Sequence, residues 1–319
     1  MRKIDTKEIL NILPQSIKAA LGDLVQSKTL QEIRIRADKP LVFQVGNKEI
    51  VNKYTPRSDD LKTIIQRMSN YSIYAFEEEL KQGYITIKGG HRVGVCGKCV
   101  IEKNEVKTIK NIASLNIRIC REVKGCSDSI MKFIIKSNEV INTIIISPPK
   151  CGKTTLIRDI TRNISDGMDK MFFEGKKVCV VDERSELGAC FNGIPQLNIG
   201  LRTDVLDGCP KSEGIMMAIR SMSPDVIVCD EIGAYKDIDS ILNALNSGVS
   251  LITTIHGYDV EDLYNRPVFK EIVENNVFNR AIVLSNKKGA GTVERVYDFS
   301  TKSVIWSIPV IKSFRLWDE

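Results

Sequence analysis

The sequence predicts an α/β protein in which a smaller α+β domain precedes a larger domain built on buried parallel strands. Its 319 residues exceed the length of one average domain. The first part alternates apolar and polar residues, as in sheets that expose one face, whereas the second contains short, continuously apolar runs, as in strands buried on both faces. We place the N-terminal domain at residues 1–125, a linker helix at 126–139 and the larger domain at 140–319.

The N-terminal part begins with helical spacing in DTKEILNILPQSIKAAL, where Pro14 predicts a break between two short helices. Apolar and polar residues then alternate, and Gly46-Asn47 predicts a turn into a further strand. Helical spacing returns over residues 58–81, and residues 84–119 are again strand-like. This order predicts a largely antiparallel sheet with helices, which is an α+β domain.

The larger domain contains four apolar segments, TIIIS, KVCVVD, DVIVCD and SLITTIH. Such segments, separated by longer and partly helical stretches, are typical of buried parallel strands in an α/β domain. After the first of them, Leu156, Ile160 and Ile164 recur at helical spacing and predict one apolar helix face. Between the two domains, KGCSDSIMKFIIKSNE predicts the linker helix.

The stretch SPPKCGKTTLIRD joins a strand to a helix and nearly matches the phosphate-binding P-loop, G-x-x-x-x-G-K-[ST]. Ser147 replaces the first glycine, which a small residue can do where φ is not forced positive. Backbone N–H groups and the helix N-terminus bind phosphate, the Lys153 ammonium reaches the β and γ phosphates, and the Thr154 hydroxyl binds Mg²⁺. The candidate nucleotide-binding residues are Ser147, Pro148, Pro149, Lys150, Cys151, Gly152, Lys153, Thr154 and Thr155.

A second motif supports this interpretation. In SPDVIVCDEIG an apolar strand ends in Asp230 and Glu231, the Walker B arrangement. We expect Asp230 to hold the water shell of Mg²⁺ and Glu231 to orient or deprotonate the attacking water. Together the two motifs predict a P-loop NTPase with a nucleotide and Mg²⁺ as cofactors. The residues alone do not select adenine over guanine.

Two further segments narrow the class of P-loop NTPase. The strand SLITTIHG places Thr253, Thr254 and His256 at a carboxyl edge, where α/β sheets bind ligands, and makes them candidates for sensing the γ phosphate. A structural, hydrogen-bonded His256 is the alternative. The acidic pair Asp182-Glu183 begins a long, glycine-rich connection after the strand KVCVVD. A loop of this kind beside a nucleotide usually carries function.

Arginines complete many such sites by stabilising charge on the transferred phosphoryl group, and some come from a neighbouring subunit. The candidates are Arg92 in GGHRVG, Arg184 and Arg202, with Arg220 in reserve. Each of them is also compatible with a surface or ion-pair role.

Five motifs occur in fixed order: SPPKCGKTTLIRD, VVDERSE, LRTDVLDGCPK, AIRSMSPDVIVCDEIG and TTIHG. With EIRIRADKPL, GGHRVGVCG and GTVERVYD they cover nearly the whole chain, which resembles the stage III sporulation protein AA family of endospore-forming bacteria. That family is similar to the traffic ATPases of type II secretion and type IV pili. The resemblance implies a RecA-like P-loop NTPase core that hydrolyses ATP, in an oligomer expected to be a hexamer. It also implies a PAS-like N-terminal domain that packs between neighbouring cores.

The resemblance implies individual roles as well. Lys153 and Thr154 match the P-loop, Glu231 the catalytic acid and His256 the family's histidine box, while Asp182-Glu183 falls at the aspartate box of traffic ATPases. The implied function is a motor that energises assembly of, or transport through, the channel between mother cell and forespore. The implied partners are membrane proteins of that channel. The family's loop usually begins with glycine, so Ser147 is a departure that bears on loop geometry.

Composition sets the cellular context. Apolar residues make up 43% and charged residues 27%, as in soluble globular proteins. No apolar run approaches the ~20 residues of a membrane span, so we expect the chain to stay in the cytoplasm. The resemblance implies the cytoplasm of the mother cell, with peripheral membrane attachment through partners. The nine cysteines are scattered, as reduced thiols would be. Cys96 and Cys99 form a C-x-x-C without the second close pair of a zinc site, which favours strand or turn thiols.

Two other functions stay open at this point. Residues 1–139 hold 25 Lys and Arg against 16 Asp and Glu, a net charge of +9, which keeps a nucleic-acid-dependent RecA-like ATPase open. Aromatic residues are only 6% and are not interleaved with basic ones, so no nucleic-acid partner is expected. The other alternative is a scaffold that binds nucleotide without turnover, which Ser147 supports and Glu231 opposes.

Overall fold

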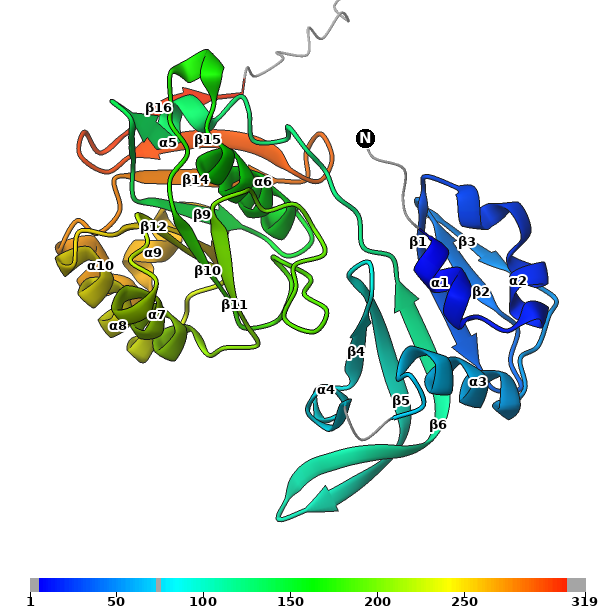
Figure 1. Cartoon of the computed structure of the whole chain (residues 1–319). Helices are drawn as coiled ribbons and strands as arrows, with labels where there is room; N and C mark the ends of the chain where they lie inside the picture. The colour runs from blue at the N-terminus through cyan, green and yellow to red at the C-terminus, as the bar shows by residue number, and fades with distance from the viewer. Residues whose placement is uncertain (1–5, 73–75, 309–319) are drawn as a thin grey trace, which may run out of the picture. The chain divides into compact units, whose positions relative to one another are not determined.

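The computed structural model describes residues 6–72 and 76–308. The chain forms two compact units, coloured along the chain in Figure 1. The N-terminal unit comprises Met1–Glu122 together with Gly188–Leu197, and the C-terminal unit comprises Val123–Leu187 together with Asn198–Glu319. A segment from the middle of the chain therefore belongs to the N-terminal unit.

The N-terminal unit is built on a six-stranded sheet of order β3-β2-β1-β6-β5-β4, in which every neighbouring pair is antiparallel. Its elements are α1 (Lys7–Ile12), α2 (Gln15–Leu21), the 3-10 helix η1 (Gly22–Gln26), β1 (Leu30–Arg36), β2 (Val42–Val45), β3 (Lys48–Val51), α3 (Ser58–Met68), α4 (Glu77–Lys81), β4 (Tyr84–Ile87), β5 (His91–Glu102) and β6 (Glu105–Arg118).

Local sequence explains these elements. Pro14 is extended and separates α1 from α2, because proline cannot donate the backbone hydrogen bond that a continuous helix needs there. On β1, Ile33 and Ile35 are fully buried, while Arg34 and Arg36 are exposed. The predicted α+β domain with an antiparallel sheet is thus confirmed.

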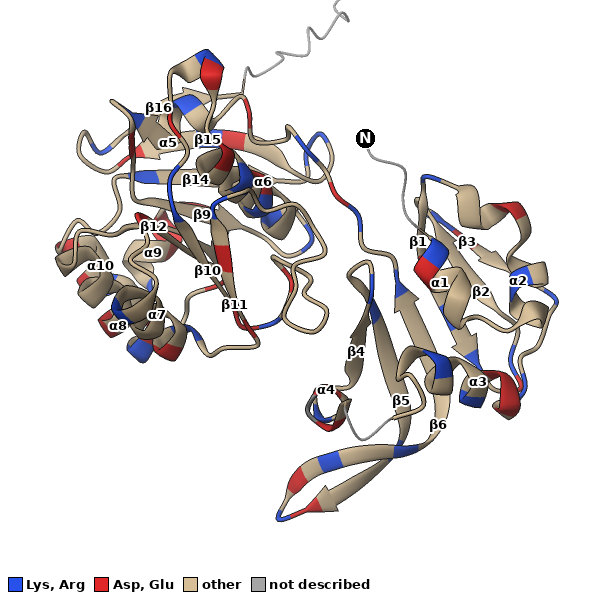
Figure 2. Cartoon of the chain, viewed as in Figure 1, with Lys and Arg blue, Asp and Glu red and all other residues tan. Residues whose placement is uncertain are grey.

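The long β5–β6 hairpin turns at Lys103 and Asn104, both with left-handed φ, as a two-residue hairpin turn requires. Figure 2 shows acidic and basic residues together along this hairpin, and Lys107 pairs with Glu102 at 2.6 Å. Part of the positive charge of the N-terminal unit is therefore neutralised locally. The predicted strand thiols Cys96 and Cys99 lie exposed on β5.

The C-terminal unit is built on an eight-stranded sheet of order β11-β10-β12-β13-β9-β14-β15-β16. The strands from β11 to β14 run parallel, and β15 and β16 add antiparallel to this sheet. Its helices and strands are α5 (Met131–Ile134), β7 (Ile135–Lys136), β8 (Glu139–Val140), β9 (Thr143–Ser147), α6 (Lys153–Asp166), η3 (Asp169–Met171), β10 (Val178–Asp182), β11 (Thr203–Asp207), α7 (Lys211–Ser221), β12 (Val226–Cys229), α8 (Tyr235–Asn246), β13 (Ser250–His256), α9 (Glu261–Asn265), η4 (Pro267–Phe269), α10 (Lys270–Glu274), β14 (Arg280–Ser285), β15 (Thr292–Asp298) and β16 (Ser303–Ser307).

Both faces of this sheet are covered, which explains the continuously apolar strands. On β9, Ile144 faces a core cluster shared with α7 and α8, and the next residue, Ile145, faces a cluster shared with α6. The predicted apolar face of α6, formed by Leu156, Ile160 and Ile164, is buried against the sheet. The prediction of buried parallel strands is confirmed.

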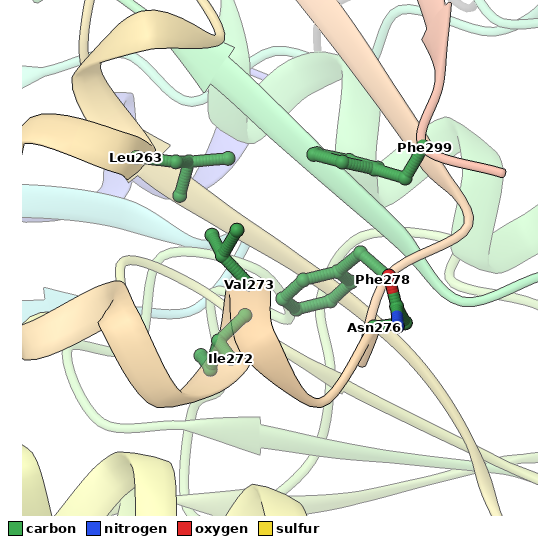
Figure 3. A pocket seen from close by; sticks show the side chains of 6 residues that line it. All are labelled: Leu263, Ile272, Val273, Asn276, Phe278 and Phe299. Atoms are coloured by element: carbon green, nitrogen blue, oxygen red, sulfur yellow. The ribbon is translucent and has the colours of Figure 1, made fainter. Parts of the chain in front are cut away.

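The core extends under the short helices α9 and α10. Figure 3 shows a small pocket there, which is lined by the apolar side chains of Leu263, Ile272, Val273, Phe278 and Phe299 and by the polar Asn276. Within residues 6–72 and 76–308, no helix combines the length and apolar character needed to cross a bilayer.

The structure differs from the sequence-based prediction between the two units. Where a linker helix was predicted over residues 126–139, α5 forms a single turn, followed by the hairpin β7–β8. Ser137 and Asn138 both adopt left-handed φ, which makes a two-residue hairpin turn and is incompatible with a helix. Strand β11 also lies within the segment predicted to be a long, glycine-rich connection, and the prediction missed it because an edge strand is only partly buried and lacks the apolar signature.

A buried carboxylate ties residues 125–127 to α6. Asp159 is 2% exposed and accepts hydrogen bonds from the Gly125 N–H (3.1 Å), the Ser127 N–H (2.9 Å) and hydroxyl (2.8 Å), and the Arg162 guanidinium (2.8 Å). Burial alone would raise the pKa of Asp159, but these hydrogen bonds from Ser127 and Arg162 outweigh burial and lower it.

We predict that Asp159→Asn destabilises the protein by about 2–3 kcal/mol, because the buried donors lose a charged acceptor. Because the pKa of Asp159 is lower in the folded than in the unfolded protein, the carboxylate stabilises the folded protein fully at pH values above the ordinary carboxyl pKa. This stabilisation is lost as the pH falls toward the pKa of Asp159 in the folded protein. Urea unfolding at a series of pH values measures both effects.

Asp169→Asn is the matched control, because Asp169 is exposed just beyond α6. It should change stability by less than about 0.5 kcal/mol. The role assigned to Asp159 would be contradicted if Asp159→Asn lost no more stability than Asp169→Asn, or if its loss of stability grew as the pH falls.

Candidate functional site

The P-loop connects β9 to α6 and begins with a residue in strand conformation. Ser147 ends β9 in register with His256 of β13, is fully buried, and donates a hydrogen bond from its hydroxyl to the Pro148 carbonyl at 2.9 Å. The left-handed conformations of the loop fall instead on Lys150 (φ 61°) and Gly152 (φ 83°). Because position 147 needs no positive φ, serine fits where the common motif has glycine.

Gly152 is required by its surroundings as well as by its φ. A Cβ on Gly152 would lie 2.8 Å from the Gly291 backbone nitrogen, which itself donates to the Cys151 carbonyl at 2.7 Å. The glycine-rich turn between β14 and β15 thus lies directly against the P-loop. Sequence reasoning missed this contact, although the cluster KKGAG was a visible signal of an unusual turn.

Lys153 lies at the first position of α6 with its side chain pointing into the site. The residue is 9% exposed, and its Nζ has no hydrogen-bond partner within the described part of the chain. Two carboxylate oxygens lie just beyond hydrogen-bond distance, Asp230 Oδ1 at 3.9 Å and Glu231 Oε2 at 3.8 Å. A buried ammonium without hydrogen bonds is costly, so this geometry fits an anion that binds at Nζ.

Oxygen ligands gather beside this ammonium. The Thr154 hydroxyl lies 3.4 Å from Asp230 Oδ2, and the Thr254 hydroxyl donates to Asp230 Oδ1. Hydroxyl and carboxylate oxygens are the donors that Mg²⁺ prefers. The residues present therefore fit the predicted Mg²⁺, held by Thr154 with Asp230 beside it.

Glu231 follows β12 in a left-handed conformation (φ 47°), which is uncommon for a residue with a side chain. Its backbone N–H donates to the Thr254 hydroxyl at 2.9 Å. Its carboxylate contacts His256 Nε2 at 2.9 Å and the Arg184 guanidinium at 3.5 Å. Strained backbone of this kind is concentrated at functional sites.

These groups line one pocket of about 400 Å³. Its residues are Pro148, Pro149, Lys150, Gly152, Lys153, Thr154, Thr155, Arg184, Glu186, Asp230, Glu231, His256 and Ala290. The structure thus brings together the P-loop, the Walker B carboxylates, His256 and Arg184, which are far apart in the sequence. Glu186 and Ala290 were not anticipated.

The other candidate arginines lie elsewhere. Arg202 donates to the Ser165 carbonyl at 2.8 Å, near the end of α6 opposite to the P-loop. Arg220 is exposed on α7. Arg92 belongs to the N-terminal unit, where its guanidinium stacks 4.1 Å from the Tyr84 ring centroid. Of the four arginines, the structure places only Arg184 in the pocket.

The acidic pair at the end of β10 shapes the adjoining loop. The Asp182 carboxylate accepts hydrogen bonds from the backbone N–H groups of Glu186 (2.8 Å) and Leu187 (2.9 Å). Glu183 pairs with Lys211 of α7. From the other side, the Arg158 guanidinium donates to the Leu187 carbonyl at 2.8 Å. Asp182 thereby holds the loop that carries Arg184 into the pocket.

The family model for sporulation stage III, protein AA, matches residues 3–304. The chain belongs to this family. It is 45% identical over 293 residues to stage III sporulation protein AA of Bacillus subtilis (strain 168), covering 91% of this chain and 94% of that protein. It is also 26% identical over 278 residues to the uncharacterized protein ycf45 of Porphyra purpurea, covering 84% of this chain and 44% of that protein.

Among solved structures, the Legionella pneumophila ATPase DotB is similar with a TM-score of 0.54 and 16% identity, over 80% of this chain and 72% of that one. The pilus retraction motor PilT with bound ADP has a TM-score of 0.55 and 15% identity, over 84% and 76% of the two chains. At these identities the likeness concerns the fold alone. The family member described here therefore has the predicted α/β fold, with a RecA-like core.

We predict that Gly152→Ala weakens nucleotide binding by about tenfold, or 1.4 kcal/mol. Alanine is strained at a φ of 83° by about 1–2 kcal/mol, and its Cβ would also push the turn at Gly291 away from the P-loop. Titration with a fluorescent ADP analogue measures the change in binding.

Gly248→Ala is the matched control for backbone strain. Gly248 has a φ of 77°, but a Cβ there would meet no described atom within 4 Å, and it lies beyond the end of α8. The control should lose stability without losing nucleotide affinity. Equal affinity in both variants would show that the contact with Gly291 does not shape the site.

Proposed function

We propose that this chain binds ATP with Mg²⁺ and hydrolyses it, as a motor of the traffic-ATPase type. The observation that carries the proposal is the buried Lys153 Nζ, which lacks a hydrogen-bond partner in the described chain and faces two carboxylates at the N-terminus of α6. This arrangement suits the β and γ phosphates of a nucleotide.

Each residue of the pocket then has a role. Lys153, the helix N-terminus and the backbone N–H groups of the loop bind the phosphates. Thr154 and Asp230 would hold Mg²⁺, which when bound supplies positive charge to the phosphate oxygens. Glu231 orients the attacking water and takes its proton. His256, 2.9 Å from the Glu231 carboxylate, holds that carboxylate in position.

The family relationship and the fold support a further proposal about the oligomeric state of the protein and the cellular process in which it acts. We infer an oligomer, a hexamer by resemblance to the traffic ATPases, in which cycles of ATP hydrolysis move one unit against the other. The motor works at the mother-cell side of the channel to the forespore, attached peripherally through membrane-protein partners, and it energises channel assembly or transport.

The first test measures phosphate release from Mg²⁺-ATP alongside nucleotide binding and sizing. Glu231→Gln should lower turnover by about 10²–10⁴-fold while ATP binding is retained, because it removes only the base. Lys153→Ala should lose nucleotide binding by at least about tenfold. Lys170→Ala removes an exposed lysine from η3 and is the charge control. Wild-type protein that binds ATP in its oligomer but releases no phosphate would contradict the motor proposal.

Arg92 is our candidate for the arginine supplied by a neighbouring copy. Arg92→Ala should then abolish turnover and leave nucleotide binding intact, because the guanidinium would act only on the transferred phosphoryl group. Arg118→Ala is the matched control, since Arg118 is the exposed cross-strand neighbour of Arg92 on β6 and carries the same charge. Unchanged hydrolysis in Arg92→Ala would remove Arg92 from the site.

A further inference from the structure

We propose that Thr254 is a positioning residue for both acidic groups of the site, and that its hydroxyl decides turnover rather than nucleotide affinity. This inference rests on the proposed ATP hydrolysis, because it assigns how the Walker B carboxylates are held for that reaction. Thr254 lies on β13, beside the strand whose end carries Asp230 and Glu231.

Three contacts join Thr254 to three consecutive residues after β12. The hydroxyl donates to Asp230 Oδ1 and accepts a hydrogen bond from the Glu231 N–H at 2.9 Å. The Thr254 carbonyl accepts a further hydrogen bond from the Ile232 N–H at 3.0 Å. One hydroxyl therefore uses its donor on the metal-site carboxylate and an acceptor lone pair on the backbone of the catalytic residue.

Glu231 depends on this support. Its backbone is left-handed, and its N–H points toward the adjacent strand rather than continuing a regular ladder. Without the hydroxyl, the Glu231 N–H and Asp230 Oδ1 would both lose their partner in the same place. The chain after β12 could then relax, and the Glu231 carboxylate would leave the position set by its contact with His256.

The neighbouring Thr253 shows that this arrangement is specific to position 254. Thr253 and Thr254 are both 0% exposed, but successive residues of a strand face opposite sides of the sheet. The Thr253 hydroxyl lies 3.4 Å from the Cys229 thiol, on the face covered by α7 and α8. The two threonines are thus equally buried, and only Thr254 contacts the site.

Loss of the Thr254 hydroxyl should change turnover and the dependence of nucleotide binding on Mg²⁺. Within the described residues the Lys153 Nζ has no hydrogen-bond partner, and the Thr254 hydroxyl bonds to Asp230 and Glu231, so nucleotide affinity at saturating Mg²⁺ should persist in its absence. Thr154 and Asp230, which fit Mg²⁺, are connected to Thr254 through the Asp230 carboxylate. Loss of a hydrogen bond behind a ligand typically costs 10- to 100-fold in metal affinity or activity.

The experiment compares Thr254→Val, Thr254→Ser and Thr253→Val in the full chain. Valine keeps the branched shape and removes the hydroxyl, whereas serine keeps the hydroxyl. Thr254→Val should lower kcat by about 10- to 100-fold and raise the Mg²⁺ concentration needed for binding of a fluorescent ADP analogue, with KM for ATP changed by less than about threefold. Thr254→Ser should recover most of kcat, and Thr253→Val should behave as wild type in both measurements.

Two results would overturn the inference: kcat and Mg²⁺ dependence in Thr254→Val that match wild type, or equal losses in Thr253→Val. If the wild-type protein binds nucleotide but does not hydrolyse ATP, the motor proposal fails by itself. The Mg²⁺ dependence of ADP binding then still decides the role of Thr254, since it reports on Asp230 without turnover.

Discussion

The buried ammonium of Lys153 is the constraint on which the arrangement of the site depends. A cation that is 9% exposed and lacks hydrogen bonds within the described residues is unfavourable unless negative charge lies near it. Asp230 and Glu231 supply that charge at 3.9 and 3.8 Å, close enough to stabilise the cation and too far to occupy its donors. The loop, the helix N-terminus and the end of β12 are therefore arranged around a position for an anion.

Parallel strand order brings these groups together. β12, β13 and β9 are neighbours, so their carboxyl ends meet at one edge of the sheet, where α/β folds bind ligands. Asp230 and Glu231 come from the end of β12, Thr254 and His256 from β13, and the P-loop from β9. Hydrogen bonds across these strand ends hold the Asp230 carboxylate and the backbone of Glu231, and His256 and Arg184 contact the Glu231 carboxylate.

The turn between β14 and β15, at the extended side of the parallel sheet, also contributes to the site. β14 extends the parallel order beside β9, and β15 returns antiparallel, so the turn between them lies against the P-loop and places Ala290 in the pocket.

Family membership rests on 45% identity across nearly the whole of a curated relative, whereas the likeness to DotB and PilT concerns the fold alone. The chemistry proposed for this chain therefore rests on its own pocket.

The sequence by itself determined the architecture and the main motifs. Apolar runs predicted the parallel strands, alternation predicted the antiparallel sheet, and SPPKCGKTT with SPDVIVCDEIG located the P-loop and the two acids, because these signals are local in the chain. Tertiary structure decided what depends on strand order and pairing. It placed Arg184 beside Glu231 and Arg202 at the far end of α6, turned Thr254 toward the acids and Thr253 away, replaced the predicted linker helix with a hairpin, and brought Gly291 against Gly152. No spacing along one chain encodes these contacts, since each joins segments that meet only when the sheet is assembled.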